Sequence, residues 1–279
     1  MLFDGGVAPL FVDGGGRQCL YCSDKDMQDD LKHVEKLLRD SRRVLFITGA
    51  GVSAESGMPT FRGAAAAFPD GRTEEGEPFE HVLSGSTFLL EPKLSWKYFF
   101  RLELSLRGKQ PNAAHLAMAD LQTSERSVCI ATQNIDGLHQ ASGSRFVLEL
   151  HGNLRRIVCT RCEYRQYHET FEGMSPLPLC PTCRAVLRPD AVLYEESLPE
   201  DVFDQFEAEQ TRGFDLIFSV GTTSVFDYVT QPILAATDRG VPVVEINPEE
   251  TLVSNLVDFR FAGPAGKTMQ ALVEAARSP

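Results

Sequence analysis

Residues 44–54 read VLFITGAGVSA, an apolar, β-branched run that ends in a glycine turn. The run predicts a buried strand, and Gly49, Gly51 and Ala54 in the turn fit the dinucleotide-binding pattern G-x-G-x-x-A. The glycines of that pattern let the backbone approach a pyrophosphate at a helix N-terminus. A dehydrogenase also carries an acidic residue about 20 positions further on, at the end of a second strand. Asp70 lies near that distance but follows an alanine run and a proline, so the second half of the pattern is missing.

The composition describes a globular chain with an acidic surface. Apolar residues make up 43% of the 279 residues, which is enough for one large domain or for a large domain with a smaller inserted module. The formal net charge of −12 argues against nucleic acid as a direct partner, because phosphate binding needs a basic face. The acidic excess is interpreted either as a solvated surface or as attraction for a lysine-bearing substrate.

Residues 1–24 differ from the rest and are predicted to form an N-terminal extension. They lack the basic start and the long apolar run of a secretory signal. No stretch approaches the roughly 20 apolar residues of a membrane span, so we expect a cytoplasmic protein without a membrane partner, and we take it to be a monomer. Cys19 and Cys22 form a C-x-x-C pair, which is interpreted as incidental and reduced, with metal or redox work as the alternative.

Short apolar runs recur along the chain with helical patterns between them, as in a parallel sheet that is covered on both faces. Leu31, Val34, Leu37 and Leu38 recur at helical spacing and predict a helix before the first strand. The predicted fold class is therefore α/β, a Rossmann-like parallel sheet with helices on both faces. We expect strands in five runs: 44–48, 127–131, 146–150, 214–220 and 241–246.

Two stretches interrupt this alternation and predict a small lobe beside the sheet. Residues 64–125 are predicted to form a loop and a helical insertion, and residues 152–196 are rich in proline and cysteine. Both belong to a single domain, 25–279. The rest of that domain is expected to form a large nucleotide-binding lobe from three segments: 25–63, 126–151 and 197–279.

Four cysteines within the small lobe have the spacing of a metal site. They form the pattern C-x2-C-x17-C-x2-C, which falls within the range of zinc ribbons. Four thiolates leave no open position on a tetrahedral zinc ion, so the metal is expected to be structural. Two disulfides are the alternative, which the lack of an export signal disfavours. The expected ligands are Cys159, Cys162, Cys180 and Cys183.

Further motifs follow the predicted strands. Ligands of parallel sheets bind outside the carboxyl ends of the strands, so we expect these motifs to gather at one edge. Taken singly, each has an ordinary explanation, such as a turn residue or a strand-end histidine. The motifs are TFRG at 60–63, TQNIDGLH at 132–139, HG at 151–152, GTT at 221–223 and EIN at 245–247.

Together with GAGVSAESGMP and the cysteine pairs, these motifs resemble the sirtuins over roughly residues 26–276. Sirtuins are NAD-consuming protein-lysine deacylases. The resemblance implies that NAD is a co-substrate broken at its nicotinamide bond, and that the partners are acyl-lysine side chains of proteins. It also implies that the lysine's acyl oxygen attacks the ribose, after which the acyl group passes to a ribose hydroxyl of ADP-ribose.

The resemblance further implies a role for each matching residue. His151 matches the general base, a natural task for histidine near neutral pH. Asn134 and Asp136 match residues that handle the nicotinamide amide and a nearby water, so these three are the expected catalytic residues. The expected cofactor-binding residues are Gly49, Ala50, Gly51, Ala54, Phe61, Arg62, Gln133, Asn134, Ile135, Asp136, Gly221, Thr222, Thr223 and Asn247.

Tyr98 and Arg101 suggest which acyl group is removed. They are three residues apart in a helical pattern and so share one helix face. The sirtuin branch that removes succinyl and malonyl groups carries Tyr-x-x-Arg here, and Ala64 matches a small residue that widens its pocket. A guanidinium and a phenol suit a carboxylate, so we expect both residues to bind substrate and succinyl- or malonyl-lysine to be preferred over acetyl-lysine. The alternative is a core tyrosine beside a surface arginine.

Two other functions stay open at this point. An ADP-ribosyltransferase would use the same NAD site with a different acceptor. An NAD-binding sensor without turnover would need the cofactor site but no general base. The presence of His151, Asn134 and Asp136 counts against the sensor.

Overall fold

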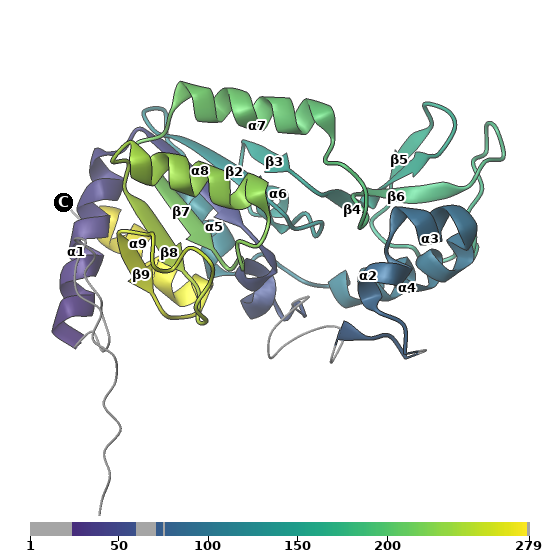
Figure 1. The fold of residues 1–279 in the computed structure, drawn as a ribbon, viewed down its shortest axis with the longest axis horizontal. Coiled ribbons are helices and arrows are strands. Elements are labelled where there is room, and N and C mark those ends of the chain that lie inside the picture. The colour runs from purple at the N-terminus through teal and green to yellow at the C-terminus, as the bar shows by residue number, and fades with distance from the viewer. Residues whose placement is uncertain (1–23, 60–70, 75, 278–279) are drawn as a thin grey trace, which may run out of the picture.

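The computed structural model describes residues 24–59, 71–74 and 76–277. A large lobe surrounds a parallel sheet, and a small lobe beside it combines helices with a three-stranded antiparallel sheet (Figure 1). No helix among the described residues is both long and apolar enough to cross a bilayer. The predicted residues that lie outside the described ones are Cys19, Cys22, Phe61, Arg62 and Ala64.

The large lobe is built on six parallel strands in the order β3-β2-β1-β7-β8-β9. The last residue of β1, Thr48, lies opposite both Thr132 and Val220, so neighbouring strands end at the same level. All five predicted strands are confirmed, whereas β9 was not predicted because its run is only three residues long. The strands are β1 (Arg43–Thr48), β2 (Ser127–Thr132), β3 (Val147–Glu149), β7 (Leu216–Val220), β8 (Val243–Ile246) and β9 (Phe259–Phe261).

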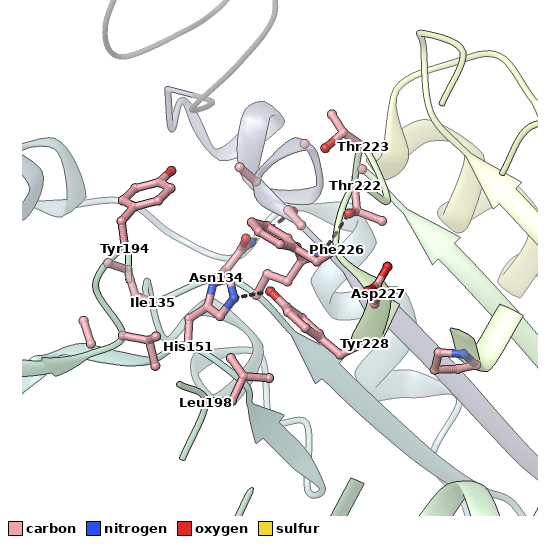
Figure 2. Close-up of a pocket in the computed structure, with 18 of the residues that line it drawn as sticks. Asn134, Ile135, His151, Tyr194, Leu198, Thr222, Thr223, Phe226, Asp227 and Tyr228 are labelled. Atoms are coloured by element: carbon pink, nitrogen blue, oxygen red, sulfur yellow. Dashed lines mark hydrogen bonds between the residues drawn. The ribbon is translucent and has the colours of Figure 1, made fainter. Parts of the chain in front are cut away.

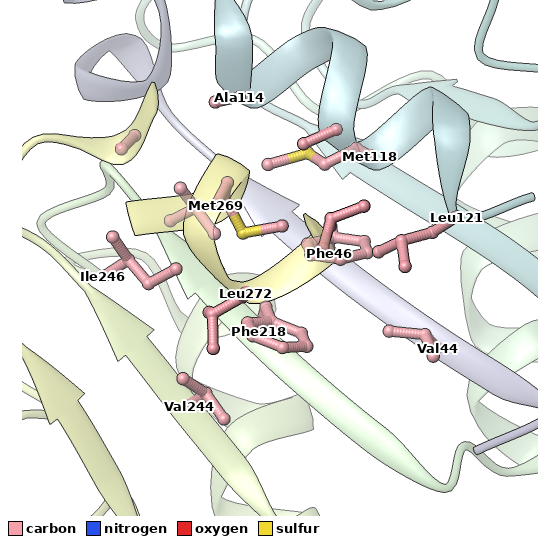
Figure 3. Close-up of a cluster of buried hydrophobic side chains, with 14 of the residues drawn as sticks. Val44, Phe46, Ala114, Met118, Leu121, Phe218, Val244, Ile246, Met269 and Leu272 are labelled. Carbon is pink, nitrogen blue, oxygen red and sulfur yellow. The ribbon is translucent and has the colours of Figure 1, made fainter. Parts of the chain in front are cut away.

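Alternate side chains of the central strand β1 fill two cores, one on each face of the sheet. Val44 and Phe46 belong to the core under α1, α5 and α9, where Phe46 stacks on Phe218 with ring centroids 4.7 Å apart (Figure 3). Leu45 and Ile47 belong to the core under α7 and α8. Burial on both faces explains why the strand is a continuous apolar run. The helices are α1 (Asp24–Asp40), α5 (Ala113–Asp120), α7 (Glu200–Arg212), α8 (Asp227–Asp238) and α9 (Ala265–Arg277).

The small lobe has a core of its own around Trp96. The indole N–H of Trp96 donates to the carbonyl of Leu187 (2.8 Å), and its ring lies 5.6 Å from Phe99 and 5.7 Å from Phe171. The helices and strands of this lobe are α2 (Phe79–Val82), α3 (Gly85–Leu90), α4 (Pro92–Leu106), β4 (Gly152–Cys159), β5 (Arg165–Tyr167) and β6 (Leu187–Ala191). Two short helices belong to the large lobe: η1 (Ala50–Ser56) and α6 (Leu138–Ala141).

Helix α5 lies inside the range 64–125 that we expected to form the helical insertion, but it packs on the large sheet. Ala114, Met118 and Leu121 share a core with Phe46 (Figure 3). The apolar face of α5 meets α9 and β1, so the helices of the small lobe are α2, α3 and α4.

Replacing Met118 by alanine tests this position of α5. Met118 is fully buried, so Met118→Ala should lower the free energy of unfolding by about 2–5 kcal/mol. Leu116 on the same helix is 50% exposed, and Leu116→Ala should cost no more than about 1 kcal/mol. Urea unfolding measures both values, and equal costs would contradict the packing of α5 on the large sheet.

Candidate active site and metal centre

Two backbone turns meet where β1 and β7 end. The amide of Gly49 donates to the carbonyl of Val220 across 3.2 Å. The amide of Gly51 donates to the carbonyl of Gly221 across 2.8 Å. Gly221 has a φ of +60°, and a Cβ atom on it would lie 2.3 Å from the backbone nitrogen of Val52. A side chain there would separate the turns, so the position requires glycine.

A cavity of about 1560 Å³ opens at this edge of the sheet, with residues of both lobes in its wall. Part of the wall is drawn in Figure 2. Asp136 lies beside it, in a small pocket of about 40 Å³ that shares Ala50, Asn134 and Ile135 with the main cavity. The other described residues that were predicted for cofactor binding or catalysis all line the main cavity: Gly49, Ala50, Gly51, Ala54, Gln133, Asn134, Ile135, His151, Gly221, Thr222, Thr223 and Asn247.

Asn134 and Asp136 are buried and held in place by hydrogen bonds. The side-chain amide of Asn134 donates to the carbonyl of Gly49 (3.1 Å) and to Oγ of Ser53 (3.2 Å). The carboxylate of Asp136 accepts from Oγ of Ser53 (2.7 Å) and from the amide of Leu138 (2.9 Å). Both side chains are therefore preorganised against the glycine turn, as a binding site requires.

Two buried histidines, His115 and His139, lie behind this network; sequence reasoning gave neither a role, although His139 ends the motif TQNIDGLH. Nε2 of His139 is 3.0 Å from Oγ1 of Thr48, and Nε2 of His115 is 3.4 Å from Oγ of Ser53. Burial lowers the pKa of His115 to about 4, against the opposing charge of Asp136, and burial also holds the pKa of His139 well below its usual value. Both imidazoles are neutral at pH 7 and support the site through hydrogen bonds. His115 lies 62 positions from Ser53, so no local pattern indicated this contact.

Thr222 lies beside Gly49 and connects three strand ends. Nε2 of Gln133 donates to Oγ1 of Thr222 (2.9 Å), and Nδ2 of Asn247 donates to the Thr222 carbonyl (2.9 Å). Hydroxyl and amide groups of this kind can bind sugar and phosphate oxygens. The arrangement fits the adenosine half of a dinucleotide.

His151 immediately precedes β4, where the two lobes join. Its ring is hydrogen-bonded to the backbone of Gln133, and Nε2 lies 2.5 Å from the hydroxyl of Tyr228 (Figure 2). Burial lowers the pKa of His151 to about 4, against the opposing effect of the Gln133 hydrogen bond, so the imidazole is neutral at pH 7. Its Nε2 therefore carries a lone pair and can serve as a base. The contact with Tyr228 was not predicted, because it joins positions 77 apart.

Tyr98 and Arg101, the expected substrate-binding residues, lie beside the cavity and not among its described lining residues. Tyr98 is fully buried in the core of the small lobe. Arg101 lies over the Tyr98 ring at 5.2 Å and forms an ion pair with Glu74 at 2.5 Å. Neither residue is in the wall of the cavity, whereas Phe99 and Leu102 are. Consecutive side chains of a helix point about 100° apart. The face of α4 that meets the cavity therefore carries Phe99 and Leu102, and the neighbouring face carries Tyr98 and Arg101.

The loop that follows β6 packs against the small-lobe helices. The amide of Tyr194 donates to the carbonyl of Leu83 (3.0 Å), and the amide of Gly85 donates to the carbonyl of Tyr194 (2.9 Å). Glu195 has a φ of +72°, a left-handed conformation that favours glycine, and its carboxylate accepts from the amide of Ser86 (3.2 Å). The loop therefore forms one wall of the cavity in a strained backbone conformation.

The four predicted metal ligands lie together in the small lobe. Their Sγ atoms all lie within 4.8 Å of one another, with Cys159 and Cys183 at 3.4 Å and Cys162 and Cys180 at 3.6 Å. Tetrahedral zinc with bonds of about 2.3 Å separates its thiolates by about 3.8 Å, so the cluster fits one ion. All five described cysteines are free thiols, which leaves the four thiolates available as ligands. The centre fits a structural zinc ion that holds the ends of β4 and β6.

A nucleotide-binding α/β protein with an inserted four-cysteine module is the class that this fold and site define. The model of the Sir2 family matches residues 49–227. The chain is 41% identical to NAD-dependent protein deacylase 2 of Pseudomonas aeruginosa, over 89% of this chain and 98% of that protein. The chain belongs to the Sir2 family.

Solved structures show the same likeness. A complex of a Sir2 homolog with NAD superposes with a TM-score of 0.80 at 36% identity, covering 88% of this chain and 93% of that one. A Sir2 protein with a deacetylated p53 peptide and 3′-O-acetyl ADP ribose gives a TM-score of 0.76 at 27% identity, covering 88% and 97%. The resemblance drawn from the motifs is confirmed.

Metal analysis of Cys180→Ser protein tests the metal centre. The variant lacks one thiolate, so it should lose its zinc, and the small lobe should unfold at a lower temperature than in the unaltered protein. Cys129 is buried in β2 outside the cluster, and Cys129→Ala should keep one zinc ion per chain. Full zinc occupancy in the Cys180→Ser protein would contradict the assignment.

Proposed function

We propose that this protein removes acyl groups from lysine side chains of other proteins and consumes one NAD for each group removed. The observation that carries the proposal is the position of His151, a neutral base in the wall of the cavity that the glycine turn and Asn134 also line. The relative in Pseudomonas aeruginosa is named as an NAD-dependent protein deacylase. The solved relatives hold NAD in one case, and a deacetylated peptide with an acetylated ADP ribose in the other.

The residues of this chain fit NAD as the co-substrate. Gly49 and Gly51 line the cavity at a strand end and carry no side chains, so a pyrophosphate can approach the backbone there. The buried amide of Asn134 and carboxylate of Asp136 suit the carboxamide of nicotinamide. Bound NAD supplies a ribose carbon that can lose nicotinamide and a neighbouring hydroxyl that can accept the acyl group.

His151 serves as the general base of the acyl transfer. A ribose hydroxyl becomes a nucleophile only as it loses its proton, and a neutral imidazole can accept that proton. Nε2 faces Tyr228, so we assign the ring's hydrogen bond to the backbone of Gln133 to Nδ1, which leaves Nε2 as the accepting atom. Figure 2 shows His151 between Tyr194 and Thr222, so the base can reach groups from both sides.

The small lobe limits which acyl groups the cavity accepts. Phe99 and Leu102 line the cavity from α4, and none of the described residues in its wall is lysine or arginine. A carboxylate placed there would lose its water without gaining a cationic partner among the described residues, because Arg101 is ion-paired with Glu74. We therefore propose a preference for uncharged acyl groups such as acetyl. The preference for succinyl and malonyl groups that Tyr98 and Arg101 suggested is the alternative.

Nicotinamide release, measured with an acetyl-lysine peptide and with the same peptide unmodified, tests the activity. Release that depends on the acetyl group is expected. Release that is independent of the acetyl group would instead favour an ADP-ribosyltransferase, and no release would favour an NAD-binding sensor.

Replacing His151 by alanine tests the base. Removal of a general base typically costs 10²–10⁴-fold, so His151→Ala should lower acyl transfer by about that factor. The affinity for NAD, measured by calorimetry, should change by only a few-fold. His33 is exposed on α1, and His33→Ala is the matched control, with activity like that of the unaltered protein. Acyl transfer in the His151→Ala protein within a few-fold of normal would exclude the role.

A double substitution in α4 tests the acyl preference. Phe99→Tyr with Leu102→Arg places a phenol and a guanidinium in the cavity wall, which should raise desuccinylation relative to deacetylation by at least about tenfold. Arg101→Met should leave that ratio unchanged, because Arg101 is not in the wall. The measurement is kcat/KM with matched acetyl and succinyl peptides. An unaltered enzyme that prefers succinyl peptides, and loses that preference in the Arg101→Met protein, would restore the alternative.

A further inference from the structure

The hydroxyl of Tyr228 is hydrogen-bonded to Nε2 of His151, the atom on which acyl transfer depends. That hydroxyl lies 2.5 Å from Nε2, so we assign the ring's hydrogen bond to the backbone of Gln133, and with it the ring proton, to Nδ1. Nε2 therefore has no proton to give, and the phenol is the donor in this hydrogen bond. The Nε2 lone pair that would take a proton from the ribose hydroxyl therefore already accepts a hydrogen bond from Tyr228.

Packing holds the phenol in this position. The rings of Tyr228 and Phe226 stack with centroids 5.4 Å apart and an interplanar angle of 12°. The ring of His151 lies edge-on to both, at 5.9 and 6.1 Å (Figure 2). Tyr228 is also in the first turn of α8, and it lines the same cavity as His151 and Asn134. The phenol thus lies inside the site as part of a three-ring cluster.

We propose that Tyr228 is a further catalytic residue, which relays a proton from the ribose hydroxyl to His151. The inference rests on the proposed function, because it takes His151 to be the base. A phenol that donates one hydrogen bond can accept another at the same oxygen. A ribose hydroxyl can therefore donate to Oη of Tyr228 while Oη donates to Nε2. Direct contact between the ribose and Nε2 would instead require the phenol to leave the stacked cluster.

The relay is balanced in protons and electrons. The O–H bond of the ribose hydroxyl breaks, and its proton bonds to Oη of Tyr228. The original phenolic proton moves to Nε2 of His151 at the same time. The phenol stays neutral and the imidazole gains one positive charge. The electron pair left on the ribose oxygen forms the new bond to the acyl carbon, while the π bond between that carbon and the lysine nitrogen breaks and its electron pair passes to the nitrogen.

Tyr228→Phe tests the relay, because it removes the hydroxyl and keeps the stacked ring. Formation of O-acyl-ADP-ribose should fall by about 10²-fold, the lower end of the range for loss of a proton-transfer group. Exchange of labelled nicotinamide into NAD, which requires the acyl peptide but no deprotonated ribose hydroxyl, should stay within a few-fold. The ratio of the two rates is the readout.

Tyr167→Phe is the matched control, since Tyr167 carries an exposed phenol on β5 and does not line the cavity. That variant should keep the ratio of acyl transfer to nicotinamide exchange. Acyl transfer at an unchanged or higher rate in the Tyr228→Phe protein would overturn the relay. An equal fall in both rates would also overturn it, because the phenol would then only support binding or folding. Absence of exchange in the unaltered protein would refute the proposed function itself.

Two further measurements do not depend on the rate at which the variant turns over. In the unaltered enzyme, a plot of the rate of acyl transfer against the deuterium fraction of the solvent should be curved, as expected when two protons move together. A linear dependence would overturn the relay. In the protein without substrate, the 15N NMR signal of Nε2 in His151 should shift in the Tyr228→Phe variant toward that of a nitrogen without a hydrogen bond. An unchanged signal would overturn it as well.

Discussion

The close approach of the two backbone turns at the ends of β1 and β7 is the constraint on which the rest of the site depends. The Gly51 amide reaches the Gly221 carbonyl across 2.8 Å, and a Cβ atom on Gly51 would lie 2.7 Å from Cα of Gly221. The strands run parallel and end at one level, so every residue that follows a strand is delivered to this edge. This parallel arrangement brings together three side chains from different strand ends, those of Asn134, Thr222 and Asn247. They lie just beyond the apolar cores on the two faces of the sheet.

The junction of the two lobes places the base. His151 lies between the amide of Leu150, which donates to the carbonyl of Thr132 in the large sheet, and Gly152, the first residue of β4. Its own carbonyl accepts from the amide of Val192 in the small lobe. Gly152 has a φ of +74°, which allows the chain to turn from one sheet into the other. The base is thus anchored to both lobes, and the cavity between them is where cofactor and substrate can meet.

The strands and the metal centre could be predicted because their signals are local in sequence: apolar runs for the strands and paired cysteines for the metal. Three features depended on tertiary structure. Helix α5 packs where its apolar face finds a partner, which its position in the chain does not reveal. The pattern of Tyr98 and Arg101 could not show that the next face of the helix meets the cavity. The contact of Tyr228 with His151 joins segments that only the fold brings together.

The identity of the reaction product tests most directly whether this edge of the sheet carries an NAD-dependent deacylase. With NAD and an acetyl-lysine peptide, we expect nicotinamide, the deacetylated peptide and O-acetyl-ADP-ribose in equal amounts. Mass spectrometry of the mixture identifies all three, and the same peptide without its acetyl group is the control. Peptide or protein that carries ADP-ribose, or NAD recovered intact beside an unchanged peptide, would contradict the deacylase.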